Sequence, residues 1–183
     1  MPEDNISQNF TRLKLWNINE LEDDRAKEIF QSFIDKQGFV PNWARVMAND
    51  PEILVAFVQL MKVTMSPGSV DVKLKWMIAN EVSDLNKCTY CVGVTEAMLE
   101  SLGAEEDLLK KIEAHKDLSE AESAALEYAK LVTTEAYKVP DNTFDKLEDH
   151  FSSEQILEIT AVVGLFNYIN RFNDALRVLP EKV

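Results

Sequence analysis

Apolar residues recur every three to five positions along most of the chain, which is the spacing of one face of an α-helix. In residues 19–37 this stripe consists of Leu21, Ala26, Ile29, Phe30, Phe33 and Ile34. A similar period runs through residues 70–86, 119–140 and 152–176, and the last of these segments is apolar over much of its circumference. No segment shows the strict alternation of a half-buried strand. The pattern predicts an all-α protein.

Local sequence signals mark where these helices begin and end. Gly38 and Gly103 are positioned as C-terminal stops, and Pro140 closes the segment before it. Asp50 followed by Pro51 is typical of a helix start, and Ser119 with a glutamate three residues later forms a capping box. One helix is expected to end near residue 86, and the next is expected to carry the two cysteines as far as Leu102.

The length of 183 residues is close to that of one ordinary domain. Five glycines and six prolines are few, which favours long helices over a fold with many turns. We therefore expect a single helical-bundle domain over 1–183, with an N-terminal extension at 1–18 and a core of about 70–103 around the cysteines. Several helices are so apolar that a neighbouring subunit is expected to cover part of them.

The formal net charge of −13 makes nucleic acid an unlikely partner, because an acidic surface repels phosphates. No apolar run approaches the ~18 residues that span a bilayer, so no membrane association is expected. The acidic N-terminus lacks the basic and apolar parts of a secretory signal. These features predict a cytoplasmic protein.

The chain contains only two cysteines, Cys88 and Cys91, and they are three residues apart. On a helix this spacing places both thiols on one face, where they can close a disulfide. If the helix breaks at Asn86 and Lys87, both sulfurs lie at a helix N-terminus, where the dipole and the Lys87 charge favour a reactive thiolate. The pair is interpreted as a redox centre.

Other roles for the pair are weaker. Two buried cysteines also occur simply as small hydrophobic residues. A structural zinc site needs about four ligands, and the chain has no second cysteine pair and only His115 and His150. A thioredoxin fold places such a pair in a βαβ context that is missing here. No metal or other cofactor is expected.

The residues around the pair resemble a known family. The stretch 80–91 is similar to the core of the AhpD-like, or carboxymuconolactone decarboxylase, superfamily. Residues 38–43 and 49–52 are similar to the N-terminal part of its peroxidase-related branch, and 166–175 is similar to its C-terminal helix. The resemblance covers most of the chain between residues 38 and 178.

This resemblance implies an all-helical AhpD-like fold that assembles as a homo-trimer or homo-hexamer. It implies a thiol peroxidase whose partners are a hydroperoxide substrate and a thiol or disulfide reductant. In that family the second cysteine, here Cys91, is peroxidatic, and the first, here Cys88, is resolving.

The sequence departs from the family pattern at two positions. Thr95 stands where the family has a histidine, and Trp76 stands where it has a glutamate. These two family residues relay the proton of the peroxidatic thiol, and neither threonine nor tryptophan is a base near neutral pH. Glu81 and Glu96 are candidate substitutes, although both also suit an exposed surface.

His115 is a further candidate if it folds back onto the site, and Tyr90 is expected to contact the site because it lies between the cysteines. The leading hypothesis is a thiol peroxidase with an altered proton relay. The alternative is a redox-sensing, disulfide-exchange or binding protein of the same fold that has lost catalysis. Lactone decarboxylation is disfavoured, because that reaction does not use a cysteine pair.

Overall fold

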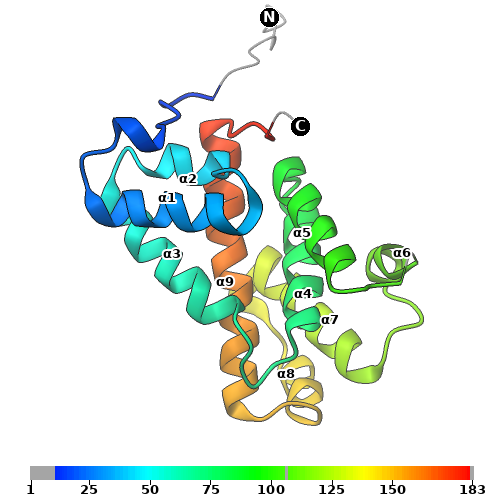
Figure 1. Cartoon of the computed structure of the whole chain (residues 1–183). Helices are drawn as coiled ribbons and strands as arrows, with labels where there is room; N and C mark the ends of the chain where they lie inside the picture. The colour runs from blue at the N-terminus through cyan, green and yellow to red at the C-terminus, as the bar shows by residue number, and fades with distance from the viewer. Residues whose placement is uncertain (1–10, 106, 182–183) are drawn as a thin grey trace, which may run out of the picture. The chain divides into compact units, whose positions relative to one another are not determined.

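The computed structural model describes residues 11–105 and 107–181. Within these ranges the chain forms α-helices and short 3-10 helices, without a strand (Figure 1). The all-α fold class is thereby confirmed. The elements are η1 (Ile18–Glu20), α1 (Asp24–Gln37), α2 (Asn42–Met47), α3 (Pro51–Met65), α4 (Val72–Leu85), α5 (Thr89–Ser101), α6 (Leu108–Ala114), α7 (Glu120–Glu135), η2 (Ala136–Lys138), α8 (Asp141–Glu148) and α9 (Ser153–Leu176). None of the described helices combines the length and hydropathy needed to cross a membrane.

Contacts divide the chain into two compact units, one of residues 1–59 with 173–183 and one of residues 60–172. Each unit is described by itself below. The expectation that residues 1–183 form a single domain stays a prediction. The expected N-terminal extension, 1–18, lies mostly outside the described residues.

The first unit is organised around Trp43 of α2. Its ring makes edge contacts with Phe33, at 5.6 Å between ring centroids, and with Phe57, at 5.3 Å. Asn42 binds the C-terminal segment, because its backbone N–H donates to Glu181 Oε1 at 2.7 Å and its side-chain amide donates to Leu179 O at 2.9 Å. The aromatic cluster thus holds α1, α2 and α3 together within this unit, and the contacts of Asn42 join it to the C-terminal segment.

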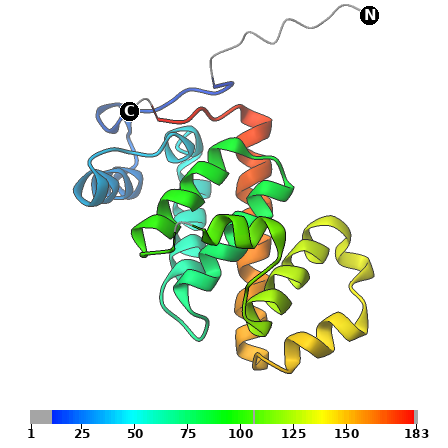
Figure 2. The same ribbon diagram turned by 90° about the vertical axis from the view of Figure 1, so that its right-hand side faces the viewer.

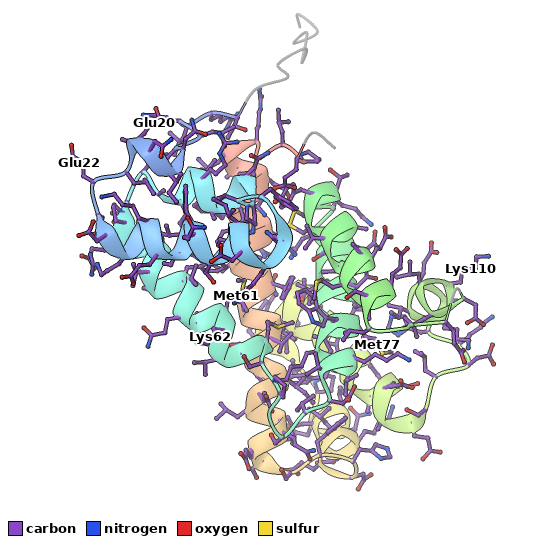
Figure 3. All side chains as sticks on the ribbon, viewed as in Figure 1. Glu20, Glu22, Met61, Lys62, Met77 and Lys110 are labelled. Carbon is purple, nitrogen blue, oxygen red and sulfur yellow. A yellow bond between two sulfur atoms is a disulfide. The ribbon has the colours of Figure 1, made fainter. Side chains whose placement is uncertain are left out.

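The second unit is built on α4, which packs against both α5 and α7. The predicted apolar stripe of α4 is buried at Leu74, Met77, Ile78 and Val82. Burying each such side chain contributes about 1.5–3 kcal/mol. Figure 3 shows the contrast between the interior Met77 and Lys110, which projects outward from α6. The stripe therefore fixes the face that α4 turns to its neighbours.

Several predicted helix ends are confirmed. Gly38 adopts φ 83°, a left-handed conformation that glycine tolerates, and its N–H donates to Ile34 O at 2.8 Å. The Asp50 side chain accepts hydrogen bonds from the N–H groups at the start of α3. Ser119 forms the predicted capping box with Glu122. These helix ends could be predicted because all the residues of each capping motif lie within a few positions of one another in the sequence.

Other elements were predicted wrongly or missed. The first helix begins at Asp24 rather than at residue 19, since residues 18–20 form a 3-10 turn. Pro140 does follow the end of the helical segment α7–η2, as expected, but it also directly precedes α8, and neither α6 nor α8 was predicted. Both are short, and α8 packs along α7, as Figure 2 shows for the yellow and orange-yellow helices. Tertiary packing stabilises helices of this length more than their own propensity does.

A buried ion pair holds the connection between α3 and α4. The Lys75 side chain is fully buried, and its ammonium group binds both Ser66 O and the Glu158 carboxylate of α9. The same carboxylate accepts from Ser69 Oγ at 2.7 Å and from the Val70 N–H at 2.9 Å. A side chain at Gly68 would collide with it. The Glu158 carboxylate therefore organises the whole 66–70 loop.

Candidate functional site

The backbone that leads into the cysteine pair is fixed by hydrogen bonds from the end of α4. Lys87 adopts φ 61°, and its N–H donates to Asp84 O at 2.9 Å, while the Cys88 N–H donates to Ser83 O at 3.1 Å. This is the Schellman arrangement that closes a helix around one left-handed residue. The predicted helix break at Asn86 and Lys87 is thus confirmed, and Cys88 is held directly against the last turn of α4.

Cys88 is the N-cap residue of α5, and Cys91 lies within its first turn. The two side chains form a disulfide, with Cα atoms 5.3 Å apart, inside the usual range for such bonds. Cys88 is completely buried, whereas Cys91 keeps 4% of its surface exposed. When the bond is reduced, the unpaired N–H groups of this helix end favour a thiolate. The structure brings the two sulfurs together as the spacing predicted.

The two residues at the family's relay positions have other partners. Thr95 is fully buried on α5, where its hydroxyl accepts from Asn80 Nδ2 and donates to Val92 O, both at 2.9 Å. Trp76 on α4 makes an edge contact with Phe166, with ring centroids 5.9 Å apart. The hydrogen bond from Asn80 makes the Thr95 hydroxyl a structural link between α4 and α5, and the hydrogen of that hydroxyl is committed to Val92 O.

Glu81 and His115 form a hydrogen-bonded pair. His115 Nε2 lies 3.1 Å from Glu81 Oε1, and the carboxylate side chain is 8% exposed while the imidazole is 30% exposed. His115 ends α6 with a left-handed φ of 48°, which directs the chain back towards α7. A surface position for Glu81 was therefore wrong, and His115 does fold back onto α4. The two residues are 34 positions apart in the chain, which hides this contact from the sequence.

The remaining candidates are placed as follows. Glu96 is partly exposed on α5, and Tyr90 is buried within the first turn of that helix. The Lys87 side chain is largely exposed, with its ammonium group 3.4 Å from Asp84 Oδ2. The roles proposed for these side chains stay predictions. Across residues 11–181, residue 106 apart, no group of three or more histidine, cysteine or acidic side chains is arranged to hold a metal ion.

Three buried polar residues on α4 and α9 were not anticipated. Asn80 holds Thr95, as described above, and Ser83 Oγ lies 3.3 Å from Asn170 Oδ1 of α9. All three of Asn80, Ser83 and Asn170 lie on otherwise apolar helix faces. Polar residues that interrupt an apolar stripe were the available signal, because such groups are usually buried only with a partner.

No protein-family model matches the chain. The chain is 28% identical to the uncharacterized protein YnjA of Escherichia coli over 62% of its own length and 68% of that protein. Its fold is similar to that of a peroxidase-related protein of Ralstonia eutropha described as an alkylhydroperoxidase AhpD core, with a TM-score of 0.87, 24% identity and coverage of 96% and 95% of the two chains. The chain therefore has an AhpD-like helical fold.

Two further solved structures extend the likeness. A peroxidase-related protein of Silicibacter is 26% identical, with a TM-score of 0.85 and coverage of 95% of this chain and 93% of that one. The debrominase Bmp8 is also 26% identical, with a TM-score of 0.76 over 86% of this chain and 87% of that one. The AhpD-like fold predicted from the residues around the cysteines is thus confirmed.

Proposed function

We propose that the protein is a two-cysteine thiol oxidoreductase that reduces hydroperoxides. The observation that carries the proposal is the Cys88–Cys91 disulfide at the N-terminus of a helix. The peroxidase-related proteins with this fold support it. In this function the structure corresponds to the oxidised state that follows turnover, and a thiol reductant is the second partner.

The reaction uses the two sulfurs in sequence. The Cys91 thiolate attacks one oxygen of the hydroperoxide, the O–O bond breaks, and the other oxygen leaves as an alcohol or water. Cys91 is then a sulfenic acid, which the Cys88 sulfur attacks with loss of water to form the disulfide. An external dithiol reduces that bond and is itself oxidised. Cys91 suits the first step, since it is the cysteine of the pair that retains exposed surface.

The test compares single cysteine variants in the presence of a dithiol. Wild type should consume hydroperoxide continuously. Cys88→Ser should react once and accumulate a sulfenic acid on Cys91, detected as a dimedone adduct by mass spectrometry. Cys91→Ser should consume none. Consumption by Cys91→Ser at the wild-type rate would show that the role assigned to Cys91 is wrong.

A second candidate function is reductive removal of a halogen from an aromatic ring. The likeness to the debrominase Bmp8, one of whose structures holds tribromopyrrole, favours it. The electrons balance in the same way: two thiols become a disulfide, the carbon–halogen bond becomes a carbon–hydrogen bond, and halide and a proton leave.

Bromide release from tribromopyrrole by the reduced protein separates the two candidates. Release that depends on Cys91, without peroxide consumption, would replace the peroxidase proposal. Reversible disulfide formation without turnover of either substrate would instead favour the redox-sensing or disulfide-exchange alternative. The homo-oligomeric state and the cytoplasmic location stay predictions, for which size measurement in solution and localisation of the tagged protein are the direct tests.

A further inference from the structure

One face of the long helix α9 carries a row of exposed residues that bear no charge (Figure 1). The row consists of Leu157, Ala161, Gly164 and Tyr168, at spacings of four, three and four, and we call it the α9 stripe. This is the spacing of the contact positions in a coiled coil. Leu157 is 71% exposed and Tyr168 is 47% exposed. A continuous apolar row that faces water is typical of an interaction surface.

Gly164 lies in the middle of the α9 stripe, where nothing in the surrounding fold requires a glycine. A β-carbon at this position would meet no atom within 4 Å among the described residues. Glycine inside a helix is destabilising relative to alanine, and it is used where another backbone must come close. The other inner residue of the stripe, Ala161, is also small. The middle of the stripe is thus shaped for the close approach of a second helix.

Opposite charges stand at the two ends of the α9 stripe. Glu154 lies three residues before Leu157, Arg171 lies three residues after Tyr168, and both are exposed. Arg171 Nη1 donates to Asn167 O and Oδ1, which leaves the Nε and Nη2 edge of the guanidinium group for a carboxylate. Neither Glu154 nor Arg171 forms an ion pair with another described residue. Each end of the stripe therefore presents a charge that the fold itself does not neutralise.

The α9 stripe and its two end charges are complementary to themselves about a midpoint between residues 162 and 163. Three pairs of positions are equally far from this midpoint: Glu154 with Arg171, Leu157 with Tyr168, and Ala161 with Gly164. Two copies of α9 that run antiparallel about a two-fold axis there bring each residue opposite its pair on the other copy. Opposite charges then meet at both ends, large apolar side chains meet inside them, and small residues meet at the axis.

We propose that α9 pairs antiparallel with α9 of a second copy of this chain, with Glu154 of each copy bound to Arg171 of the other. The free edge of the guanidinium group then receives a carboxylate, and the two helices come closest at Ala161 and Gly164. A trimer with three-fold symmetry alone has no two-fold axis. The assembly therefore contains an even number of chains, as in a dimer or a hexamer. This inference does not depend on the chemistry of the cysteine pair.

Charge reversal tests the pairing. Sedimentation velocity should show wild type as an assembly of an even number of chains. Glu154→Arg and Arg171→Glu should each raise the dissociation constant of the two-fold contact by at least about tenfold, because like charges then face each other twice. Each variant alone should have half the wild-type mass at a concentration where wild type is assembled, with the fold checked by circular dichroism. An equimolar mixture of the two should regain the wild-type mass, since every reversed charge then meets an opposite one.

Gly164→Gln tests the close approach without a change of charge, and it should also halve the mass. Gly93→Gln is the matched control, because Gly93 is an exposed glycine of α5 whose β-carbon would likewise meet no atom within 4 Å among the described residues. It should leave the mass unchanged.

A wild type that is monomeric or trimeric at every concentration would overturn the inference. A mixture of the charge-reversed variants that stays at half mass would overturn it too, as would equal effects of Gly164→Gln and Gly93→Gln. If a charge-reversed variant does not fold, the comparison of the two glycine variants decides alone.

Discussion

Glu81 and His115 differ in how much solvent they meet, although they share a hydrogen bond of 3.1 Å. The carboxylate is almost buried and the imidazole is partly exposed. A base that removes a thiol proton must later release it to water, and a buried carboxylate bonded to a more exposed imidazole is suited to both tasks. With Thr95 and Trp76 engaged elsewhere, this pair is our candidate for handling the proton of Cys91.

Glu81→Gln should therefore slow the reaction of reduced Cys91 with hydroperoxide at neutral pH. The general-base contribution is typically about 100-fold or more. The measurement is the pre-steady-state rate of peroxide loss, with the fold checked by circular dichroism. Glu96→Gln is the matched control, since Glu96 lies on α5 close to Cys91 in sequence and is only partly buried. A larger effect of Glu96→Gln than of Glu81→Gln would reverse the assignment of the two glutamates.

At the scale of one element, the C-terminal turn of α4 sets the backbone conformation that leads into the cysteine pair. Lys87 holds a left-handed conformation that suits glycine, because an L side chain there crowds the following carbonyl. Its own side chain is 77% exposed and lies near Asp84. Position 87 thus carries backbone strain that its side-chain contacts offset only slightly, since exposed ion pairs contribute little to stability.

Lys87→Gly should raise the free energy of unfolding by about 0.5–1 kcal/mol, the left-handed penalty less the entropy cost of glycine. Chemical denaturation of the oxidised protein measures this difference. Lys87→Ala is the control, because it removes the ammonium group but keeps the strain, and it should leave the stability nearly unchanged. The same pair of variants tests whether the Lys87 charge activates the thiols. Equal reactivity in both variants and wild type would show that the helix end, rather than Lys87, is responsible.

At the scale of the whole molecule, the Lys75–Glu158 pair ties one loop and two helices of the second unit together. Burial by itself raises the pKa of Glu158, but hydrogen bonds from Lys75, Ser69 and the Val70 N–H outweigh it and lower that pKa below its ordinary value. A carboxyl whose pKa is lower in the folded state stabilises the fold above its unfolded pKa. That stabilisation is lost as the pH falls through the lowered value.

Glu158→Gln should accordingly be less stable than wild type at neutral pH, and the difference should shrink as the pH is lowered to about 3. Thermal unfolding across that pH range measures it, with the exposed Glu148→Gln as the control. A difference that stays constant with pH would show that the charge of Glu158 does not contribute.

Removing the cation alone should be more damaging. Lys75→Met leaves the Glu158 charge uncompensated in a partly buried site and should cost about 3 kcal/mol or more, as for other broken buried pairs. The double variant Lys75→Met with Glu158→Gln should recover part of that loss in denaturant unfolding. Additive losses in the double variant would indicate that the two side chains act independently.

Much of the fold could be predicted because its signals are local. The apolar stripe of α4, the left-handed Gly38 and the capping box at Ser119 each lie within one or two helical turns. The short helices α6 and α8 could not be predicted in the same way. Their few residues carry little periodicity, and α8 gains its stability by packing on α7.

The same division applies to the candidate site. The sequence by itself determined that Cys88 and Cys91 meet at the start of a helix, because a spacing of three and a nearby helix break are local facts. Only the tertiary structure decided which groups surround the pair. Glu81 meets His115 across 34 residues, and Ser83 meets Asn170 across 87. The partner of a buried polar side chain is chosen by the packing of whole helices, which no short stretch of sequence encodes.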